Sequence, residues 1–297
     1  MDNWRLSVAT FCGLNVATVA TFNHFHLLNV GLASYNSCAH VPSDIPKHNQ
    51  IIPNEHLASQ KHLFKINELT KAKKMKLNEK KTKNMVFNFS PNQFVTKMEV
   101  NNEKIETVKE TILLGTVITD NLSWDRNCEE LIKKAYKRMQ LLNCVASFTK
   151  NRQDLKNVYL TFIRSVLEQS AVVWHSSLTK KNRNDLERVQ KVAVRIIMDK
   201  KKLSYNEELK ILKLETLEKR RTNLCLRFAK KCLKSEKMKD LFPVKKYTLK
   251  IKTRRPKKYK TMKYRTQRME KSSLPYMRAL LNEENENKLS FIKNSMK

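Results

Sequence analysis

The sequence predicts an α+β protein, in which a small antiparallel sheet is followed by a helical bundle and a basic tail. Strand patterns and turn residues lie between residues 84 and 119, and after Trp124 the apolar residues recur at helical spacing. Residues 245–271 hold 13 Lys and Arg against one acid. We therefore expect four parts: an N-terminal segment with a proline-containing linker (1–56), an α/β segment with a hairpin (57–122), a helical region (123–236) and a basic, largely flexible tail with a short terminal helix (237–297).

The N-terminal segment predicts no membrane span. The apolar stretch that begins at Leu6 falls short of the roughly 18 to 20 residues needed to cross a bilayer, because Asn23, His24 and His26 follow it. Three of the seven prolines then fall within residues 42–53, which is typical of a loop or linker.

The α/β segment predicts one helix and four strands. Apolar residues at helical spacing indicate a helix over residues 57–77, and alternation indicates a strand over 84–89. Asn101 and Asn102 tolerate positive φ, so we expect a hairpin between strands 96–100 and 104–108. The β-branched run 111–119 predicts a buried strand, in which Gly115 marks a bulge or a close approach of another backbone.

The helical region predicts four helices with an apolar stripe on each. We expect the first stripe to consist of Leu131, Ile132, Ala135, Met139 and Leu142, and the second of Leu155, Val158, Tyr159, Phe162, Val166 and Leu167. A third helix is expected over 185–198, where Asn184 and Glu187 have the spacing of a capping box. A fourth is expected over 206–234, with Leu209, Leu212, Leu217 and Leu224 inward.

Charge and composition favour a polyanionic partner and exclude several classes of enzyme. The net charge is +32, from 60 Lys and Arg against 28 Asp and Glu, and such an excess favours nucleic acid. Three glycines cannot form the glycine-rich loops of P-loop ATPases or dinucleotide-binding enzymes. The six cysteines lack paired spacing, which indicates reduced thiols, and Cys225 and Cys232 are expected to face the core.

Several motifs in order resemble the palm end and thumb of non-LTR (LINE-like) retrotransposon reverse transcriptases, over about residues 25–290. The motifs are LNEKKTK at 77–83, the Asn101-Asn102 hairpin, LGTVI at 114–118, LSW at 122–124 and DLERVQKVAVRII at 185–197. The resemblance implies a palm-remnant sheet, a helical thumb and a primer-grip strand at 114–118. It also implies Mg²⁺ in the intact family enzyme.

The resemblance stops short of the chemistry. The family's adjacent catalytic aspartates have no counterpart, because the chain contains no Asp-Asp pair. We therefore expect a truncated protein with no catalytic residue, metal or other cofactor, which is inactive alone and binds RNA or DNA regardless of sequence. The candidate nucleic-acid-binding residues are Lys80, Lys81, Lys83, Gly115, Lys133, Lys134, Lys137, Arg138, Arg254, Arg255, Lys257 and Lys258.

Two alternatives accompany this hypothesis. Residues 128–167 also resemble the small N-terminal module of an AlkB homologue that carries a methyltransferase, although no histidine here lies in the HxD pair of a ferrous dioxygenase. The other alternative is the product of a retroelement pseudogene without function. An intact retroelement polymerase is the further partner that the main hypothesis implies, and the expected location is nuclear or cytoplasmic.

Overall fold

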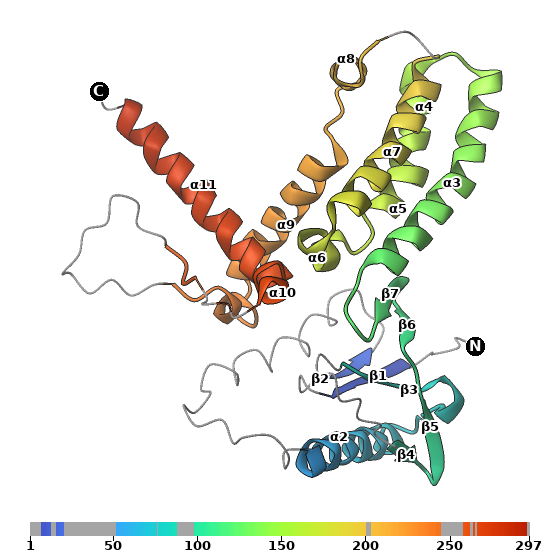
Figure 1. Cartoon of the computed structure of the whole chain (residues 1–297), viewed down its shortest axis with the longest axis vertical. Helices are drawn as coiled ribbons and strands as arrows, with labels where there is room; N and C mark the ends of the chain where they lie inside the picture. The colour runs from blue at the N-terminus through green and yellow to red at the C-terminus, as the bar shows by residue number, and fades with distance from the viewer. Residues whose placement is uncertain are drawn as a thin grey trace. The chain divides into compact units, whose positions relative to one another are not determined.

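The computed structural model describes residues 7–12, 16–20, 52–75, 77–87, 98–199, 203–244, 258–261, 264 and 266–295. The chain divides into two compact units, Met1–Ser123 and Trp124–Lys297 (Figure 1). The first unit contains all the named strands and the second nearly all the helices, so the predicted α+β class is confirmed in general terms.

The main sheet of the first unit is mixed, not antiparallel. It consists of β1 (Ser7–Cys12), β2 (Val16–Ala20), β3 (Lys83–Val86), β4 (Met98–Val100) and β5 (Glu103–Thr107), in the order β2-β1-β3-β5-β4. Strand β3 is parallel to both β1 and β5, whereas the β1–β2 and β4–β5 pairs are antiparallel. The prediction of an antiparallel sheet thus holds for these pairs and for the separate β6–β7 hairpin, but not for the pairings of β3. It also left out the two N-terminal strands.

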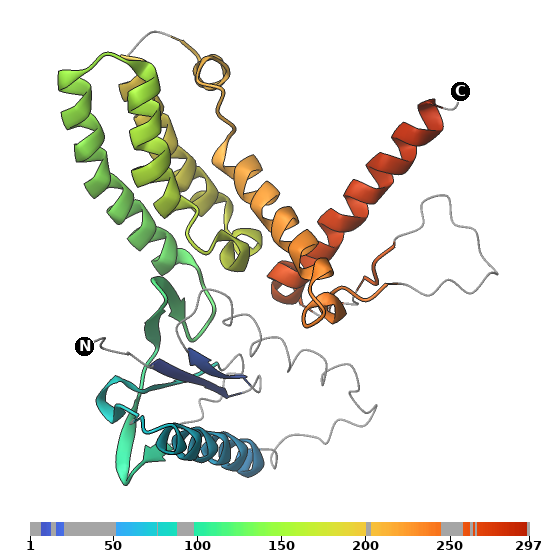
Figure 2. The ribbon, with the colours of Figure 1, turned by 180° about the vertical axis from the view of Figure 1, so that it is seen from behind.

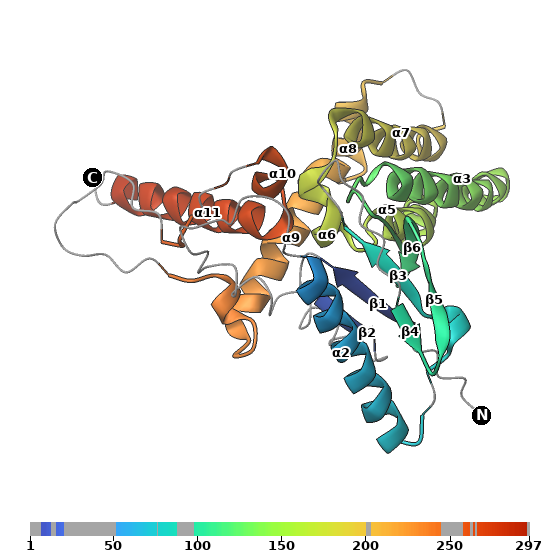
Figure 3. The same ribbon diagram turned by 60° about the horizontal axis from the view of Figure 1, so that its bottom comes forward.

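Helix α2 (Ile52–Ala72) packs on this sheet. It contacts β1, β2 and β4, as Figure 3 shows. The core of the unit consists of Leu63, Ile66, Leu77, Met98, Val100 and Ile105. The helix ends soon after Ala72, where Lys74 has a φ of 54°. The short 3₁₀ helix η1 (Glu79–Lys81) then leads directly into β3.

The first unit contains two hairpins, each closed by a two-residue turn. Asn101 and Asn102 have φ values of 51° and 66°, as a two-residue type I′ turn requires, so the predicted β4–β5 hairpin is confirmed. The run 111–119 is a second hairpin, of β6 (Glu110–Leu113) and β7 (Thr116–Thr119), and not a buried strand. Gly115, with a φ of 79°, is a turn residue and not a bulge, and Ile112 is 65% exposed. The prediction failed because Leu114 takes positive φ, which the sequence does not signal.

The second unit is a helical bundle. Its elements in chain order are α3 (Asp125–Phe148), α4 (Arg152–Val158), the π-helical turn η2 (Tyr159–Arg164), α5 (Ser165–Leu167), α6 (Ala171–Trp174), η3 (His175–Ser177), α7 (Lys180–Ile197), α8 (Tyr205–Ile211), α9 (Leu217–Lys234), η4 (Lys239–Leu241), α10 (Gln267–Glu270) and α11 (Ser273–Ser295). Helices α3 and α7 lie side by side, as Figures 1 and 2 show, and α9 contacts α6, α7 and α11. The core lies among these helices, and Trp174 and Tyr159 are its largest apolar side chains.

The apolar stripes were largely predicted, with one informative error. Phe162, expected inward, is 47% exposed, and Ile163 is buried in its place. The π-helical turn widens the helix, so the buried residues Leu155, Tyr159, Ile163 and Leu167 recur every four positions. A stripe read at 3.6 residues per turn drifts off the core across such a turn.

Two helix ends also differ from the prediction. Helix α7 begins at Lys180, and its N-cap is Thr179, whose hydroxyl accepts a hydrogen bond from the backbone N–H of Asn182. Asn184 and Glu187 therefore lie inside the helix and form no capping box. The helix expected over 206–234 is two helices, because Lys213 has a φ of 51° and Thr216 caps α9. A capping box does occur at the start of α8, between Ser204 and Glu207.

The terminal helix is longer than expected. Helix α11 has 23 residues, and its first half packs on α9. The Ser273 hydroxyl donates to the Val173 carbonyl at 2.6 Å, and the Arg278 guanidinium donates to the Leu241 carbonyl. Asn282 bonds both the N–H and the carbonyl of Tyr259, which ties residues 258–261 to the helix. The predicted tail residues Arg254, Arg255 and Lys257 lie outside the described residues.

Candidate nucleic-acid interface

The candidate lysines divide between the two units. Lys80, Lys81 and Lys83 belong to η1 and β3, in the first unit. The four candidates from Lys133 to Arg138 all lie on α3, in the second. Lys258 also lies in the second unit, where its ammonium is 5.6 Å from the centroid of the Tyr259 ring. These residues therefore form at least two separate groups, each of which is assessed by its own surroundings.

The first group borders a polar hollow of about 300 Å³, which we call the lysine hollow. It is lined by Lys80, Thr82, Lys83, Glu103, Lys104 and Glu106. Lys83 forms an ion pair with Glu106 across the β3–β5 pairing, and Glu103 supplies a second carboxylate. Lys81 is exposed, and its backbone N–H donates to the Asn78 side chain at 3.1 Å. Two carboxylates among three lysines leave the hollow nearly neutral, so its attraction for phosphate is weak.

Gly115 lies in the β6–β7 turn, which consists of Leu114 and Gly115 and contains no lysine. Its neighbour Leu114 is exposed, as is Ile112 in β6. The turn thus presents apolar side chains. Gly115, with a φ of 79°, allows the tight turn.

The second group forms one exposed side of α3, which we call the basic face. At 100° per residue, Lys134, Lys137 and Arg138 lie within about a quarter-turn of Leu141 and Phe148, and Lys133 borders them. The opposite side buries Leu131, Ala135, Met139 and Leu142. Phe148 is 85% exposed and Leu141 is 42% exposed. The face therefore combines cations with apolar side chains, where a merely solvated helix face would carry polar groups.

Arg138 joins the basic face to the π-helical turn. Its guanidinium donates to the Phe162 carbonyl at 2.8 Å. This bond fixes the arginine and places the backbone of Phe162 beside the middle of α3. The Phe162 side chain is 47% exposed.

The basic face lacks nearby carboxylates. Residues 131–153 contain six Lys and Arg and no Asp or Glu, and one of the six, Lys150, lies 3.7 Å from Asp199. At the edge of the face, Glu130 lies 4.0 Å from Lys133, and Asp154 falls in the first turn of α4. An exposed pair at this separation contributes little, so the positive potential of the face is left largely uncompensated.

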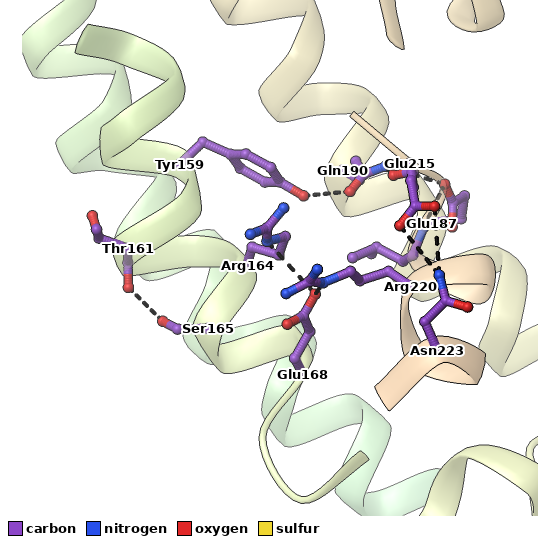
Figure 4. A network of polar contacts seen from close by, with 11 residues as sticks. Tyr159, Thr161, Arg164, Ser165, Glu168, Glu187, Gln190, Glu215, Arg220 and Asn223 are labelled. Carbon is purple, nitrogen blue, oxygen red and sulfur yellow. Dashed lines mark hydrogen bonds and ion pairs between the residues drawn. The ribbon is translucent and has the colours of Figure 1, made fainter. Parts of the chain in front are cut away.

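The carboxylates of neighbouring helices are committed to contacts within the bundle (Figure 4). Glu168, which follows α5, accepts from Arg220 of α9 at 3.0 Å and lies 3.6 Å from Arg164 of η2. Glu187 of α7 accepts from the Tyr205 hydroxyl at 2.5 Å and from the Leu217 backbone N–H at 3.0 Å. These acids hold η2, α7, α9 and the residues before α9 together.

A glutamine and two tyrosines complete this internal network. The Gln190 side chain accepts from Tyr159 and donates to the Tyr205 hydroxyl at 2.8 Å and to the Glu215 carbonyl at 3.0 Å. Burial raises the pKa of Tyr159 well above its usual value. Burial and the bond to Glu187 also raise the pKa of Tyr205. Both hydroxyls therefore stay protonated and serve as donors, so the network is structural.

A second buried group holds a neutral histidine beside an arginine. Arg221 is fully buried, donates from Nε to His175 Nδ1 at 3.3 Å and lies 5.7 Å from the Trp174 ring centroid. Burial, followed by the charges of Arg221 and Arg183, lowers the pKa of His175 to about 3. The imidazole is therefore uncharged near neutral pH, and His175 Nε2 lies 3.2 Å from the Thr222 hydroxyl.

The buried thiols show no sign of reactivity. Burial raises the pKa of Cys128 to about 12, and those of Cys225 and Cys232 to about 11. A thiol with so high a pKa is protonated at neutral pH and is therefore a weak nucleophile. Cys225 and Cys232 are both buried, so their predicted position in the core is confirmed.

The two units differ sharply in charge. The first has 14 Lys and Arg against 10 Asp and Glu, a net +4, and the second has 46 against 18, a net +28. The basic face thus lies in the unit that carries most of the positive field. The part of the chain with described side chains contains no group of three His, Cys, Asp or Glu able to hold a metal. No described helix is long and apolar enough to span a membrane.

Sequence reasoning found the cations of the basic face and missed its apolar members. It assigned Phe162 to the core and did not single out Leu141 or Phe148. One signal was available, because Leu141 and Phe148 are seven residues apart and fall outside the stripe of Leu131, Ala135 and Leu142. Comparisons with protein-family models, curated proteins and solved structures find no match to this chain.

Proposed function

We propose that this protein derives from a retrotransposon reverse transcriptase and binds RNA or DNA without sequence preference, through the basic face of α3, without polymerising it alone. The observation that carries the proposal is the run from residue 131 to 153, which contains six cations and no carboxylate, and four of the six cations lie on α3. A surface with this imbalance attracts the phosphate backbone of any nucleic acid.

The geometry supports phosphate contacts and no base-specific ones. Lys133, Lys134 and Lys137 have flexible side chains with compact charges, which suit phosphates at varied positions. Arg138 is already bonded to the Phe162 carbonyl, so it contributes charge with fewer donors available. Lysines that contact phosphate give affinity without reading sequence. Catalysis has no place in the proposal, because the chain lacks the adjacent aspartates of the family.

A salt titration tests the proposal. The full chain is titrated into a labelled RNA–DNA hybrid between about 50 and 300 mM salt, and the slope of log K against log salt is measured. We expect a slope of about −0.9 for each phosphate contacted. Lys133→Ala/Lys134→Ala/Lys137→Ala should make the slope less negative by roughly two to three.

The matched control removes three lysines from the lysine hollow. Lys80→Ala/Lys83→Ala/Lys104→Ala deletes the same charge from a site that contains two carboxylates. Its slope should change by less than one. Equal losses in the two triple variants would contradict the assignment of binding to the basic face. A primer-extension assay with Mg²⁺ on the same preparation should show no product above that of a heat-inactivated control.

A further inference from the structure

The apolar side chains of the basic face point to the kind of nucleic acid that it binds. We infer that the face prefers single strands, whose bases stack on Phe148 and Phe162 while the lysines contact the phosphates. This inference rests on the proposed function, and it names the ligand class of the same surface.

The exposure of the two rings is the first argument. Phe148 is 85% exposed at the last position of α3, and Phe162 is 47% exposed on η2. Neither ring is needed for the core of the bundle, which is filled by residues such as Leu142, Tyr159 and Ile163. Solvent-exposed phenylalanine beside cations is the surface composition of single-strand-binding proteins, in which rings stack on bases and cations track the backbone.

The second argument is the local geometry of η2. Thr161 and Ser165, which flank Phe162, lie on the side of the helix away from the internal network, as Figure 4 shows. Their hydroxyls donate to carbonyls four residues earlier, Asn157 and Thr161 respectively, so they do not compete for a ligand. The Arg138 bond to the Phe162 carbonyl holds the backbone of Phe162 beside α3.

The spacing of the rings fits a strand of a few nucleotides. Phe162 is anchored beside Arg138, and Phe148 lies ten residues further along α3, about 15 Å at 1.5 Å per residue. That distance is spanned by a strand of a few nucleotides. Lys137 and Lys134 lie along the same side of the helix, within reach of the intervening phosphates.

A duplex cannot use the rings in this way. Its bases are already stacked and paired, so a phenylalanine gains contact only by unstacking them, which costs free energy. A single strand offers free base faces of every sequence. Stacking is therefore consistent with binding that ignores sequence, because every base has such a face.

The test separates bases from phosphates. The full chain is titrated at fixed salt with a mixed-sequence single-stranded 20-mer, with its duplex, and with an abasic 20-mer that keeps the phosphates and lacks the bases. We expect the abasic strand to bind at least tenfold more weakly than the normal strand. We also expect Phe148→Ala to weaken binding of the normal strand about fivefold or more, and that of the abasic strand less than twofold.

Two variants serve as controls. Phe148→Trp keeps a stacking surface and should bind the normal strand as tightly as wild type, or more tightly. Phe64→Ala removes a phenylalanine that is also well exposed, on α2 in the other unit, and should leave binding unchanged. Phe162→Ala should weaken binding of the normal strand in the same direction as Phe148→Ala.

The outcomes distinguish this inference from the proposed function. Equal affinity for the normal and abasic strands, or tight duplex binding that Phe148→Ala leaves unchanged, would overturn the preference for single strands and leave phosphate binding intact. Absence of salt-sensitive binding to all three probes would instead overturn the proposed function itself, and the present inference with it.

Discussion

The lysine hollow and the basic face contain similar numbers of cations in opposite surroundings. In the hollow, Lys83 forms an ion pair with Glu106, and Glu103 supplies a second carboxylate. On α3, no acid follows Glu130. Lysine count alone would rank the two groups as equals. The comparison teaches that the carboxylates around a basic cluster decide whether it can attract phosphate.

The difference extends to the interior. Acids of the second unit, such as Glu168 and Glu187, are bonded to arginine, tyrosine and backbone donors inside the bundle. The internal network therefore uses these carboxylates for packing, and α3 has no acid after Glu130. In the first unit, the acids of β5 stay at the surface next to the lysines. The positive charge of the basic face thus depends on where the acidic side chains of the bundle lie.

Charge reversal on α3 should have the largest effect. At about 0.1 M salt, Lys134→Glu/Lys137→Glu removes two phosphate contacts and adds two repulsive charges, so affinity for nucleic acid should fall roughly 100-fold. The measurement is the dissociation constant for a labelled 20-mer. Lys80→Glu/Lys104→Glu makes the same charge change in the lysine hollow and should cost less than about fivefold. A comparable loss of affinity in both variants would contradict the difference between the basic face and the lysine hollow.

Protonation of the buried His175 should destabilise the bundle, in contrast to a positive charge on the surface of α3. The pKa of His175 is lowered to about 3 in the folded state, below the unfolded value of about 6.5. The unfolded chain therefore binds the proton first, and the stability due to neutral His175 is complete above pH 6.5 and declines as the pH falls toward 3. Between pH 7 and pH 4.5, the loss should be about 2.5 kcal/mol.

Urea unfolding of the wild type and of His175→Gln at the two pH values measures this contribution. The variant carries no titrating ring, so its free energy of unfolding should fall less between pH 7 and pH 4.5 than that of the wild type. Carboxylates are also protonated over this pH range, but equally in both proteins. Their contribution therefore cancels when the two losses of unfolding free energy are subtracted. Identical losses in the two proteins would mean that His175 is solvated in the folded state.

Removal of an internal carboxylate should cost more stability than removal of one beside the basic face. Glu168→Gln leaves Arg164 and Arg220 without their shared carboxylate where Glu168 is 14% exposed, so the loss should be about 2 kcal/mol. Glu130→Gln removes an acid whose nearest lysine is 4.0 Å away, and it should cost less than about 0.5 kcal/mol. Chemical denaturation at neutral pH compares them. A larger loss for Glu130→Gln would contradict the division between internal and surface acids.

The sequence predicted those parts of the fold that depend on local patterns. The Asn101-Asn102 turn and the buried stripe of α3 follow from positive-φ tolerance and from helical periodicity, and both are present. The mixed sheet could not be predicted in this way, because the parallel pairing of β3 with β1 joins residues more than 70 positions apart. Tertiary pairing of that kind leaves no local signal.

The candidate site was predicted in part for the same reason. Charge runs are visible in the sequence, so the cations of α3 were named, whereas their ion-pairing state depends on the fold. In the sequence alone, Lys83 and Lys137 are equivalent. In the fold, the β3–β5 pairing places Glu106 beside Lys83. Phe162 was assigned to the core because a π-helical turn, which changes the period, has no recognised sequence signal here.

The smallest expected effect is a gain of binding in the lysine hollow. Glu103→Gln/Glu106→Gln removes both carboxylates and leaves Lys80, Lys83 and Lys104 uncompensated. If the acids alone separate the hollow from the basic face, the affinity for a 20-mer should rise about two- to fivefold at 0.1 M salt, and the salt slope should become more negative by less than one.

The control is Glu68→Gln/Glu99→Gln, which makes the same charge change on exposed parts of α2 and β4. A rise confined to the hollow variant would show that local compensation decides the difference, since both variants have the same net charge. An equal rise in the two would mean that the overall charge of the chain governs affinity. In that case the basic face would bind most strongly only because it lies in the unit with a net charge of +28.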